Sequence, residues 1–182
     1  LELINKPIVF HVTITPYKKE IEPNVPDKSK VIEAVKKISE ILGHKNVVVR
    51  YDPIFISDTY SVAYHIKAFS KLCLELDGYI NKIIVSFIDD YKNVRKNYNT
   101  LKYKEFSNSD YALIGTNFSS IAESHNIKVS TCFEDNTLVE YGFIKDECMS
   151  KENAYQLTGK EFKCEWKARK DHKCHCVSMV DI

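Results

Sequence analysis

Apolar and polar residues are arranged in two different patterns along this chain. Short apolar runs, rich in β-branched residues, occur at 8–15, 46–51, 83–88 and 127–134, and such runs are typical of strands. Between them, apolar residues recur every three to four positions over about 28–42, 59–76 and 109–125, which predicts helices. A short helix is also predicted over about 151–158, whereas residues 91–107 are polar and have no clear period.

Residues at the expected helix boundaries support these ranges. Asp27 can cap the first helix and Gly43 can end it. Ser57 or Asp58 can cap the second helix, which Gly78 ends. Strands that alternate with helices of this length predict parallel crossover units and therefore an α/β fold.

Four such strands do not close a barrel by themselves. They form either part of a (β/α) TIM-like barrel or one side of an open α/β sheet, and we expect the barrel. We assign residues 1–135 to the partial barrel and 136–182 to an irregular, Cys-rich C-terminal tail that packs on the same domain. In both folds, ligands bind at the carboxyl ends of the strands.

Polar side chains near those strand ends are the candidate cavity residues. They are His11, Thr13, Thr15, Arg50, Asp52, Ser86, Asp89 and Glu134. Arg50 and Asp52 are two positions apart and share one face of a strand, as a charge pair in a site or as a structural ion pair. Two-carboxylate chemistry would need Asp52, Asp89 or Glu134 to converge. Each of two residues also has a purely structural interpretation. His11 can be a core histidine whose ring is hydrogen-bonded within the protein, and Asp89 can belong to a solvent-exposed turn.

Composition excludes several common classes of nucleotide-binding protein. Of 182 residues only five are Gly, and each is isolated, so neither a dinucleotide-binding fingerprint nor a P-loop occurs within the chain. The formal net charge of +1 gives no general attraction to nucleic acid or to anionic membranes. We find neither a transmembrane stretch nor a signal-peptide pattern and expect a cytoplasmic protein. The chain starts at Leu1 rather than Met, and we expect a fragment of a longer protein.

The polar segment 91–107 mixes basic and aromatic residues. They are Lys92, Arg95, Lys96, Lys102 and Lys104, interleaved with Tyr91, Tyr98 and Tyr103. Such a mixture can contact a nucleic acid strand, and a connection of this length can also act as a lid. Because the net charge is near zero, an ordinary solvated loop is the favoured interpretation.

Five of the six cysteines fall in the last 51 residues. Cys73, on the second expected helix, is most simply a buried small hydrophobe. Several thiolates of this Cys-rich region can converge on a soft metal, and Cys174 and Cys176 point the same way on an extended segment. Independent thiols and disulfides are the alternatives, although disulfides need an oxidising compartment.

Several short strings stand out along the chain, at 13–17 (TITPY), 21–26 (IEPNVP), 49–54 (VRYDPI), 86–91, 130–134, 146–148 and 174–182. In their order, and across nearly the whole chain, they resemble the bacterial domain-of-unknown-function-1848 family. The resemblance implies a radical-SAM-like (β/α) barrel whose function is uncharacterised. It also implies a C-terminal cysteine triad that holds a 4Fe–4S cluster and leaves one iron for S-adenosylmethionine. That triad would begin shortly after Ile182, and the family's first strands would precede Leu1.

Three hypotheses about function follow. The first is a piece of an iron–sulfur, radical-SAM-like enzyme, inactive as this fragment alone, that acts on an unknown small-molecule or macromolecular substrate. The resemblance matches Cys132, Cys148, Cys174 and Cys176 to family cysteines outside the triad, and the second hypothesis is a non-catalytic zinc-binding or scaffold domain that uses these four. The third is a nucleic-acid-binding or repair-related protein, for which residues 91–107 supply the basic and aromatic side chains.

Overall fold

Five parallel strands form one sheet in the computed structural model of the chain, which describes residues 8–89, 91–131, 136–145 and 151–161. The strands are β1 (Phe10–Thr13), β2 (Val47–Ile54), β3 (Lys82–Phe87), β4 (Lys128–Thr131) and β5 (Ile144–Lys145). They lie in the order β1-β2-β3-β4-β5, so each strand pairs with the next one along the chain. The prediction of parallel βα units is confirmed.

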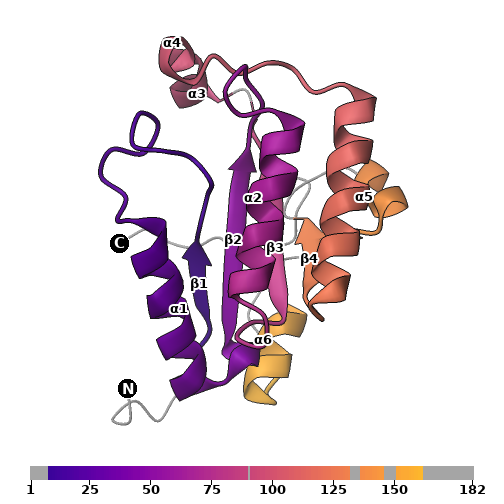
Figure 1. Ribbon diagram of the computed structural model, residues 1–182. Coiled ribbons are helices and arrows are strands. Elements are labelled where there is room, and N and C mark those ends of the chain that lie inside the picture. Colours follow the sequence, from indigo (N-terminus) through magenta and orange to yellow (C-terminus); the bar gives the residue numbers. More distant parts are fainter. Residues whose placement is uncertain (1–7, 90, 132–135, 146–150, 162–182) are drawn as a thin grey trace.

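Helices connect β1 to β2, β2 to β3 and β3 to β4, and one more described helix, α6, follows β5. The long ones are α1 (Lys28–Leu42), α2 (Val62–Glu75) and α5 (Asn108–Ser124); the short ones are α3 (Lys92–Lys96), α4 (Tyr98–Leu101) and α6 (Lys151–Thr158). Two 3₁₀ turns, η1 (His44–Asn46) and η2 (Asn136–Tyr141), complete the described elements. Figure 1 shows α1, α2 and α5 side by side in front of the sheet, with α3 and α4 beyond the carboxyl ends of the strands.

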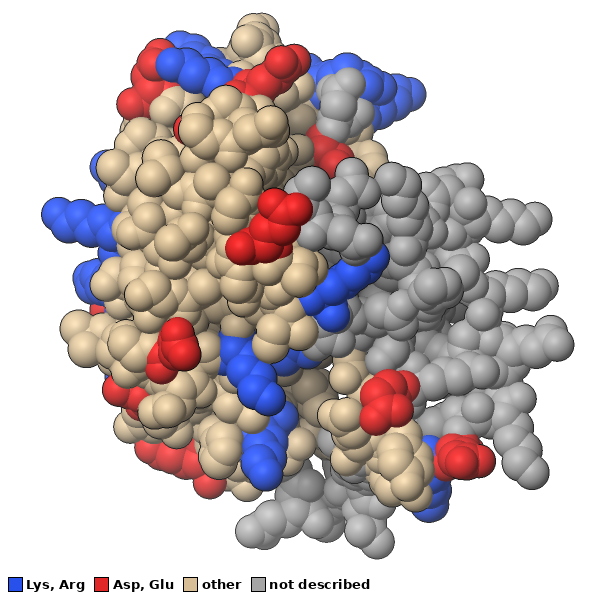
Figure 2. All heavy atoms as spheres, turned by 90° about the vertical axis from the view of Figure 1, so that its right-hand side faces the viewer, with Lys and Arg blue, Asp and Glu red and all other residues tan. Residues whose placement is uncertain are grey.

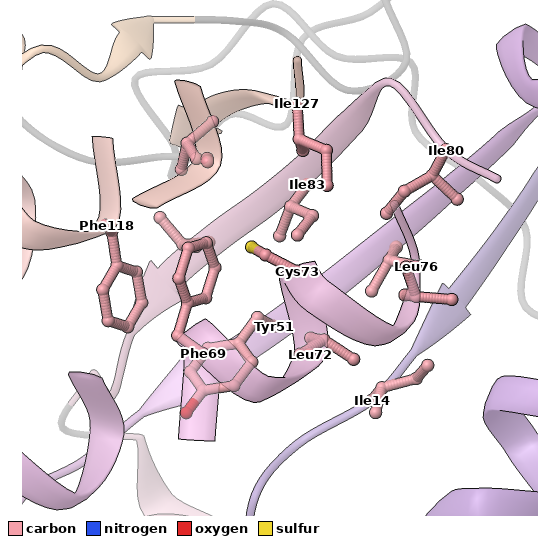
Figure 3. Packing of buried hydrophobic residues seen from close by; sticks show 14 of the residues in the cluster. Ile14, Tyr51, Phe69, Leu72, Cys73, Leu76, Ile80, Ile83, Phe118 and Ile127 are labelled. Carbon is pink, nitrogen blue, oxygen red and sulfur yellow. The ribbon is translucent and has the colours of Figure 1, made fainter. Parts of the chain in front are cut away.

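The main core lies between these three helices and the sheet. Phe69 of α2 stacks on Phe118 of α5, with ring centroids 3.8 Å apart, and Tyr51 of β2 meets both rings edge-on. Figure 3 shows Cys73 among the apolar side chains of this layer. Burial of that thiol raises its pKa to about 12, so it stays protonated, and its expected role as a buried small hydrophobe is confirmed.

Several predicted boundaries need correction. Helix α2 begins after Ser61 rather than after Ser57 or Asp58, because the Ser57 hydroxyl already accepts a hydrogen bond from the Tyr60 amide in a turn of its own. Strand β2 continues through Pro53 to Ile54 instead of ending at Tyr51. Asp27 occupies the N-cap position of α1 but makes no side-chain capping bond.

Two stretches without a periodic pattern are ordered. Residues 91–107, expected to be a loop, contain α3 and α4, and residues 136–145, expected to belong to an irregular tail, contain η2 and β5. The predicted end of the fourth strand, at 132–134, lies outside the described residues. None of the helices in the described ranges has the length and hydropathy needed to cross a membrane.

Candidate functional site

The two faces of the sheet carry different side chains. Val49, Tyr51, Ile83, Val85 and Val129 point toward the helices and belong to the main core. Side chains alternate along a strand, so the residues between them point to the opposite side. We call this side the helix-free face, because α1, α2 and α5 all lie on the other one (Figure 1). That face carries His11 and Thr13 from β1, Arg50 and Asp52 from β2, and Ser86 from β3. The expectation that these strand residues share one side is consistent with this alternation.

One row of the helix-free face runs straight across the sheet. The register places Thr13, Arg50, Ile84 and Ser130 on neighbouring strands at the same level. Neighbouring strands in a sheet are about 5 Å apart, so a small ligand lying on this row can reach side chains from two or three of them. Thr13 is exposed and Arg50 is half-buried, whereas Ser130 is buried.

Arg50 is held in place by Asp52. The Arg50 Nε donates to Asp52 Oδ2 at 3.0 Å, and the Nη2 donates to the same oxygen. The two side chains are 21% and 13% exposed, so the pair is largely screened from solvent. A guanidinium fixed in this way is preorganised to bind an anionic or carbonyl group, although the same pair also serves as a structural ion pair.

Ser130 is the polar residue of the row that sequence reasoning missed. Its side chain is 1% exposed, and its Oγ has no hydrogen-bond partner among the described residues. A buried hydroxyl without a partner costs about 1–3 kcal/mol, and such a cost is often found where a ligand completes the bond. The sequence does show Ser130 within the string at 130–134 that resembles the family. It does not show that Ser130 lies level with Arg50, because that depends on strand register.

A second polar cluster lies where the chain leaves β1. The Thr15 hydroxyl donates to Glu22 Oε1 at 2.6 Å and accepts from Lys28 Nζ at 3.1 Å, and Lys28 also pairs with Glu22. Thr15 is 4% exposed, and its hydroxyl already has two hydrogen-bond partners within the protein. The cluster fixes the connection between β1 and α1, and neither Glu22 nor Lys28 was among the residues predicted for the site.

Aromatic residues close the carboxyl end of the first two strands. The Tyr17 hydroxyl donates to the Pro53 carbonyl and accepts from the Phe55 amide, both at 2.9 Å, and its ring stacks on Phe55. His65 is fully buried beside them, and burial lowers its pKa to about 4. The neutral ring therefore donates from Nε2 to the Phe55 carbonyl at 2.8 Å and accepts the Tyr51 hydroxyl at Nδ1. Tyr17 and His65 therefore hold the segments that follow β1 and β2 in place.

Of the predicted site residues not yet placed, Asp89 is the one that the structure describes, and it lies outside this row. Asp89 is exposed in a turn after β3, in which the Tyr91 amide donates to its carbonyl oxygen. Glu134 and the four expected metal ligands, Cys132, Cys148, Cys174 and Cys176, lie outside the described residues. Within the described ranges, no group of three His, Cys, Asp or Glu side chains could hold a metal ion.

Comparison with known proteins gives one match. The family described as "Domain of unknown function (DUF1848)" matches residues 1–182. The chain matches none of the curated proteins and none of the solved structures with which it was compared.

Proposed function

The chain belongs to the DUF1848 family, and on that premise we propose that it is part of a (β/α)-barrel enzyme whose substrate binds on the helix-free face of the sheet. The observation that carries the proposal is the row formed by Thr13, Arg50 and Ser130, in which three neighbouring or near-neighbouring strands present polar groups to one side. In barrels of this kind, substrates bind at the carboxyl ends of the strands.

Strand order supports the barrel over an open sheet. An open, doubly wound sheet reverses its strand order at one point and carries helices on both faces. Among the described residues the order runs from β1 to β5 without reversal, and α1, α2 and α5 lie on one face (Figure 1). A sheet that closes into a barrel keeps this strand order and carries its connecting helices on its outer face.

The residues of the row have different roles in the proposed site. Arg50, oriented by Asp52, binds a negatively charged or carbonyl oxygen of the substrate. The hydroxyls of Thr13 and Ser130 can each donate and accept a hydrogen bond, so they orient polar groups on either side of it. Ile84, which is 1% exposed, separates Arg50 from Ser130 and provides an apolar contact between the two polar positions.

The described residues do not supply the thiolate ligands of the iron–sulfur cluster that the family resemblance implies. Cys73 is the one cysteine among them, and it is fully buried and held as a thiol. A cluster or a zinc ion in the full-length protein would therefore need thiolates outside the described ranges. We include such a cluster, with S-adenosylmethionine, in the proposal for the full-length protein, which would be kept in a reducing compartment such as the cytoplasm.

Metal analysis separates the enzyme from a zinc scaffold. The full-length protein is reconstituted anaerobically, and iron, sulfide and zinc are measured alongside absorbance in the cluster band. Iron and sulfide in equal amounts support the radical-SAM-like enzyme. Stoichiometric zinc in protein from ordinary medium supports the scaffold, and a colourless, iron-free protein contradicts the cluster.

Retention of small molecules tests the substrate face itself. The full-length protein is equilibrated with a metabolite extract and washed. The compounds that it retains are then released and identified by mass spectrometry. We expect a compound that wild type and the Lys67→Ala control retain but that Arg50→Ala loses, because Lys67 lies exposed on α2, away from the helix-free face. Identical retention by all three proteins would contradict the proposed site.

A further inference from the structure

The segment from Tyr91 to Lys104 takes no part in the proposed substrate site. It contains five basic residues and no acidic residue, although the whole chain has a formal net charge of only +1. It spans α3 and α4 and lies beyond the carboxyl ends of the strands (Figure 1). We call this segment the α3–α4 platform.

The platform is anchored to the rest of the molecule. The Lys104 amide donates to the Ile56 carbonyl at 2.8 Å, and these two residues form an antiparallel bridge. Leu101 and Tyr103 pack against a second apolar cluster, formed by Tyr17, Phe55 and Tyr60. The basic side chains are therefore held on a fixed support, which a free loop would not provide.

Positive charge on the platform faces solvent. The side chains of Lys92, Lys96 and Lys102 are exposed, and Lys92 and Lys96 lie one helical turn apart on α3. Lys104 pairs with Asp58, so that charge is already compensated. Figure 2 shows Lys and Arg side chains, with Asp and Glu side chains among them, at the upper end of the molecule, the end at which Figure 1 places α3 and α4. Phosphate groups bind to such a set of separated cations.

An aromatic side chain and a hollow lie beside these cations. Tyr98 is 51% exposed and meets Tyr103 edge-on, with the ring centroids 5.2 Å apart, so one of its faces is available for stacking. A hollow of about 310 Å³ opens between the platform and the β1–α1 connection. It is lined by Ile21, Asn93, Val94, Asn97, Thr100 and Leu101. Amide and hydroxyl groups bind base edges, and aliphatic side chains contact base faces.

We propose that the α3–α4 platform binds single-stranded nucleic acid. Lys92, Lys96 and Lys102 contact successive phosphates, one base stacks on Tyr98, and a neighbouring base enters the hollow. An anionic membrane would favour long apolar side chains at the contact, whereas the platform exposes tyrosine and asparagine there. An acidic protein would satisfy the lysines but would leave the ring and the hollow without a function. This proposal uses residues other than those of the substrate face and stands independently of it.

Fluorescence anisotropy of labelled, mixed-sequence 12-nucleotide single strands tests the proposal on the full-length protein. We expect the affinity to fall about 20-fold between 50 and 200 mM salt, the dependence given by three phosphate contacts on a single strand. The combined substitution Lys92→Gln, Lys96→Gln and Lys102→Gln should abolish most of this salt dependence and weaken binding by roughly 10-fold or more.

A charge-matched variant controls for the loss of three lysines. Lys45→Gln, Lys67→Gln and Lys128→Gln changes the net charge equally at exposed positions away from the platform and should leave binding unchanged. Equal weakening in both triple variants would overturn the proposal, because it would show attraction to overall charge.

Stacking is tested separately from charge. Tyr98→Ala should weaken binding by about 5-fold or more, and Tyr98→Phe should not, because phenylalanine keeps the ring. The proposal is overturned if the oligonucleotide does not bind, if polyphosphate binds equally well and Tyr98→Ala has no effect, or if anionic vesicles bind and the oligonucleotide does not. Displacement of the strand by micromolar adenosine monophosphate would also overturn it, in favour of a mononucleotide site.

Discussion

Two buried serines of this molecule differ in whether their hydroxyl groups have partners. Ser39 on α1 is 6% exposed and donates to the Tyr79 carbonyl, which ties the helix to the turn before β3. Ser130 on β4 is 1% exposed and has no partner among the described residues. The first serine therefore contributes to stability, whereas the second retains an unmet hydrogen-bonding capacity that a ligand can use.

Ser130→Ala should leave the free energy of unfolding unchanged or raise it by about 1 kcal/mol, because the variant removes a buried hydroxyl that has no partner among the described residues. Ser39→Ala is the matched control and should lower the free energy of unfolding by about 1 kcal/mol, since the Tyr79 carbonyl loses its donor. Urea unfolding of both variants measures the difference. A loss at Ser130 as large as that at Ser39 would show that its hydroxyl is satisfied in the folded protein.

His65 should make the protein sensitive to mild acid. Burial lowers the pKa of its ring to about 4, below the ordinary value of 6.5, so between these values the unfolded chain binds the proton more tightly. The stabilising contribution is complete above pH 6.5 and is lost as the pH falls toward 4, by about 3 kcal/mol in all.

Chemical unfolding at pH 7 and pH 4.5 checks this contribution. His65→Gln should show a smaller difference between the two pH values than wild type, because it has no group that titrates there. His44→Gln, which alters an exposed histidine, should match wild type. An equal pH dependence in all three proteins would assign the acid sensitivity to other groups.

Strand alternation predicted part of the candidate site. It placed Arg50 and Asp52 on one face of a strand, where their side chains do meet, because side-chain direction in a strand depends only on position within that strand. It could not show that Ser130 lies level with Arg50, because register is set by contacts between distant segments. The same limit applies to Thr15, whose hydroxyl is already engaged by Glu22.

At the scale of elements, helix α5 depends on a close approach to the segment that follows β4. A Cβ atom placed on Gly115 would lie 2.5 Å from the Cβ of Tyr141, so a larger residue cannot fit without displacing η2. Ser119 reinforces the contact by donating to the Tyr141 carbonyl at 2.8 Å. This packing joins η2 and β5 to the sheet.

Gly115→Ala should therefore destabilise the protein by about 1–3 kcal/mol, the usual cost of overpacking, even though alanine favours helices. Ser120→Ala, at an exposed position on the same helix, should be neutral or slightly stabilising. Thermal and urea unfolding of the two variants measure this contrast. If Gly115→Ala stabilised the protein as much as Ser120→Ala, the contact with Tyr141 would be absent.

Long periodic elements were predicted well, and short ones were not. The range of α1 agrees with its apolar stripe, and Gly43, with φ +85°, ends it as expected. Helices α3 and α4 are too short to develop a stripe, and tertiary contacts such as the bridge between Ile56 and Lys104 hold them. The start of α2 was misplaced because several consecutive polar residues could cap it, and only the fold decides which one does.

At the scale of the whole molecule, one face of the sheet is covered by α1, α2 and α5 (Figure 1). The strand register places the polar row on the other face. Parallel crossovers are right-handed, which explains why helices that join consecutive strands gather on one side. The sequence predicted these units from their alternation, but alternation alone does not separate a barrel from an open sheet. The order of the described strands, which never reverses, favours the barrel.

The position of a bound compound tests the central claim most directly. A crystal structure of the full-length protein with the compound that wild type retains, and that Arg50→Ala loses, gives that position. We predict density on the helix-free face, with polar atoms of the compound within about 2.7–3.2 Å of Arg50 or Ser130. Density on the helix-covered side of the sheet, or at a surface remote from the carboxyl ends of β1 to β4, would contradict the account.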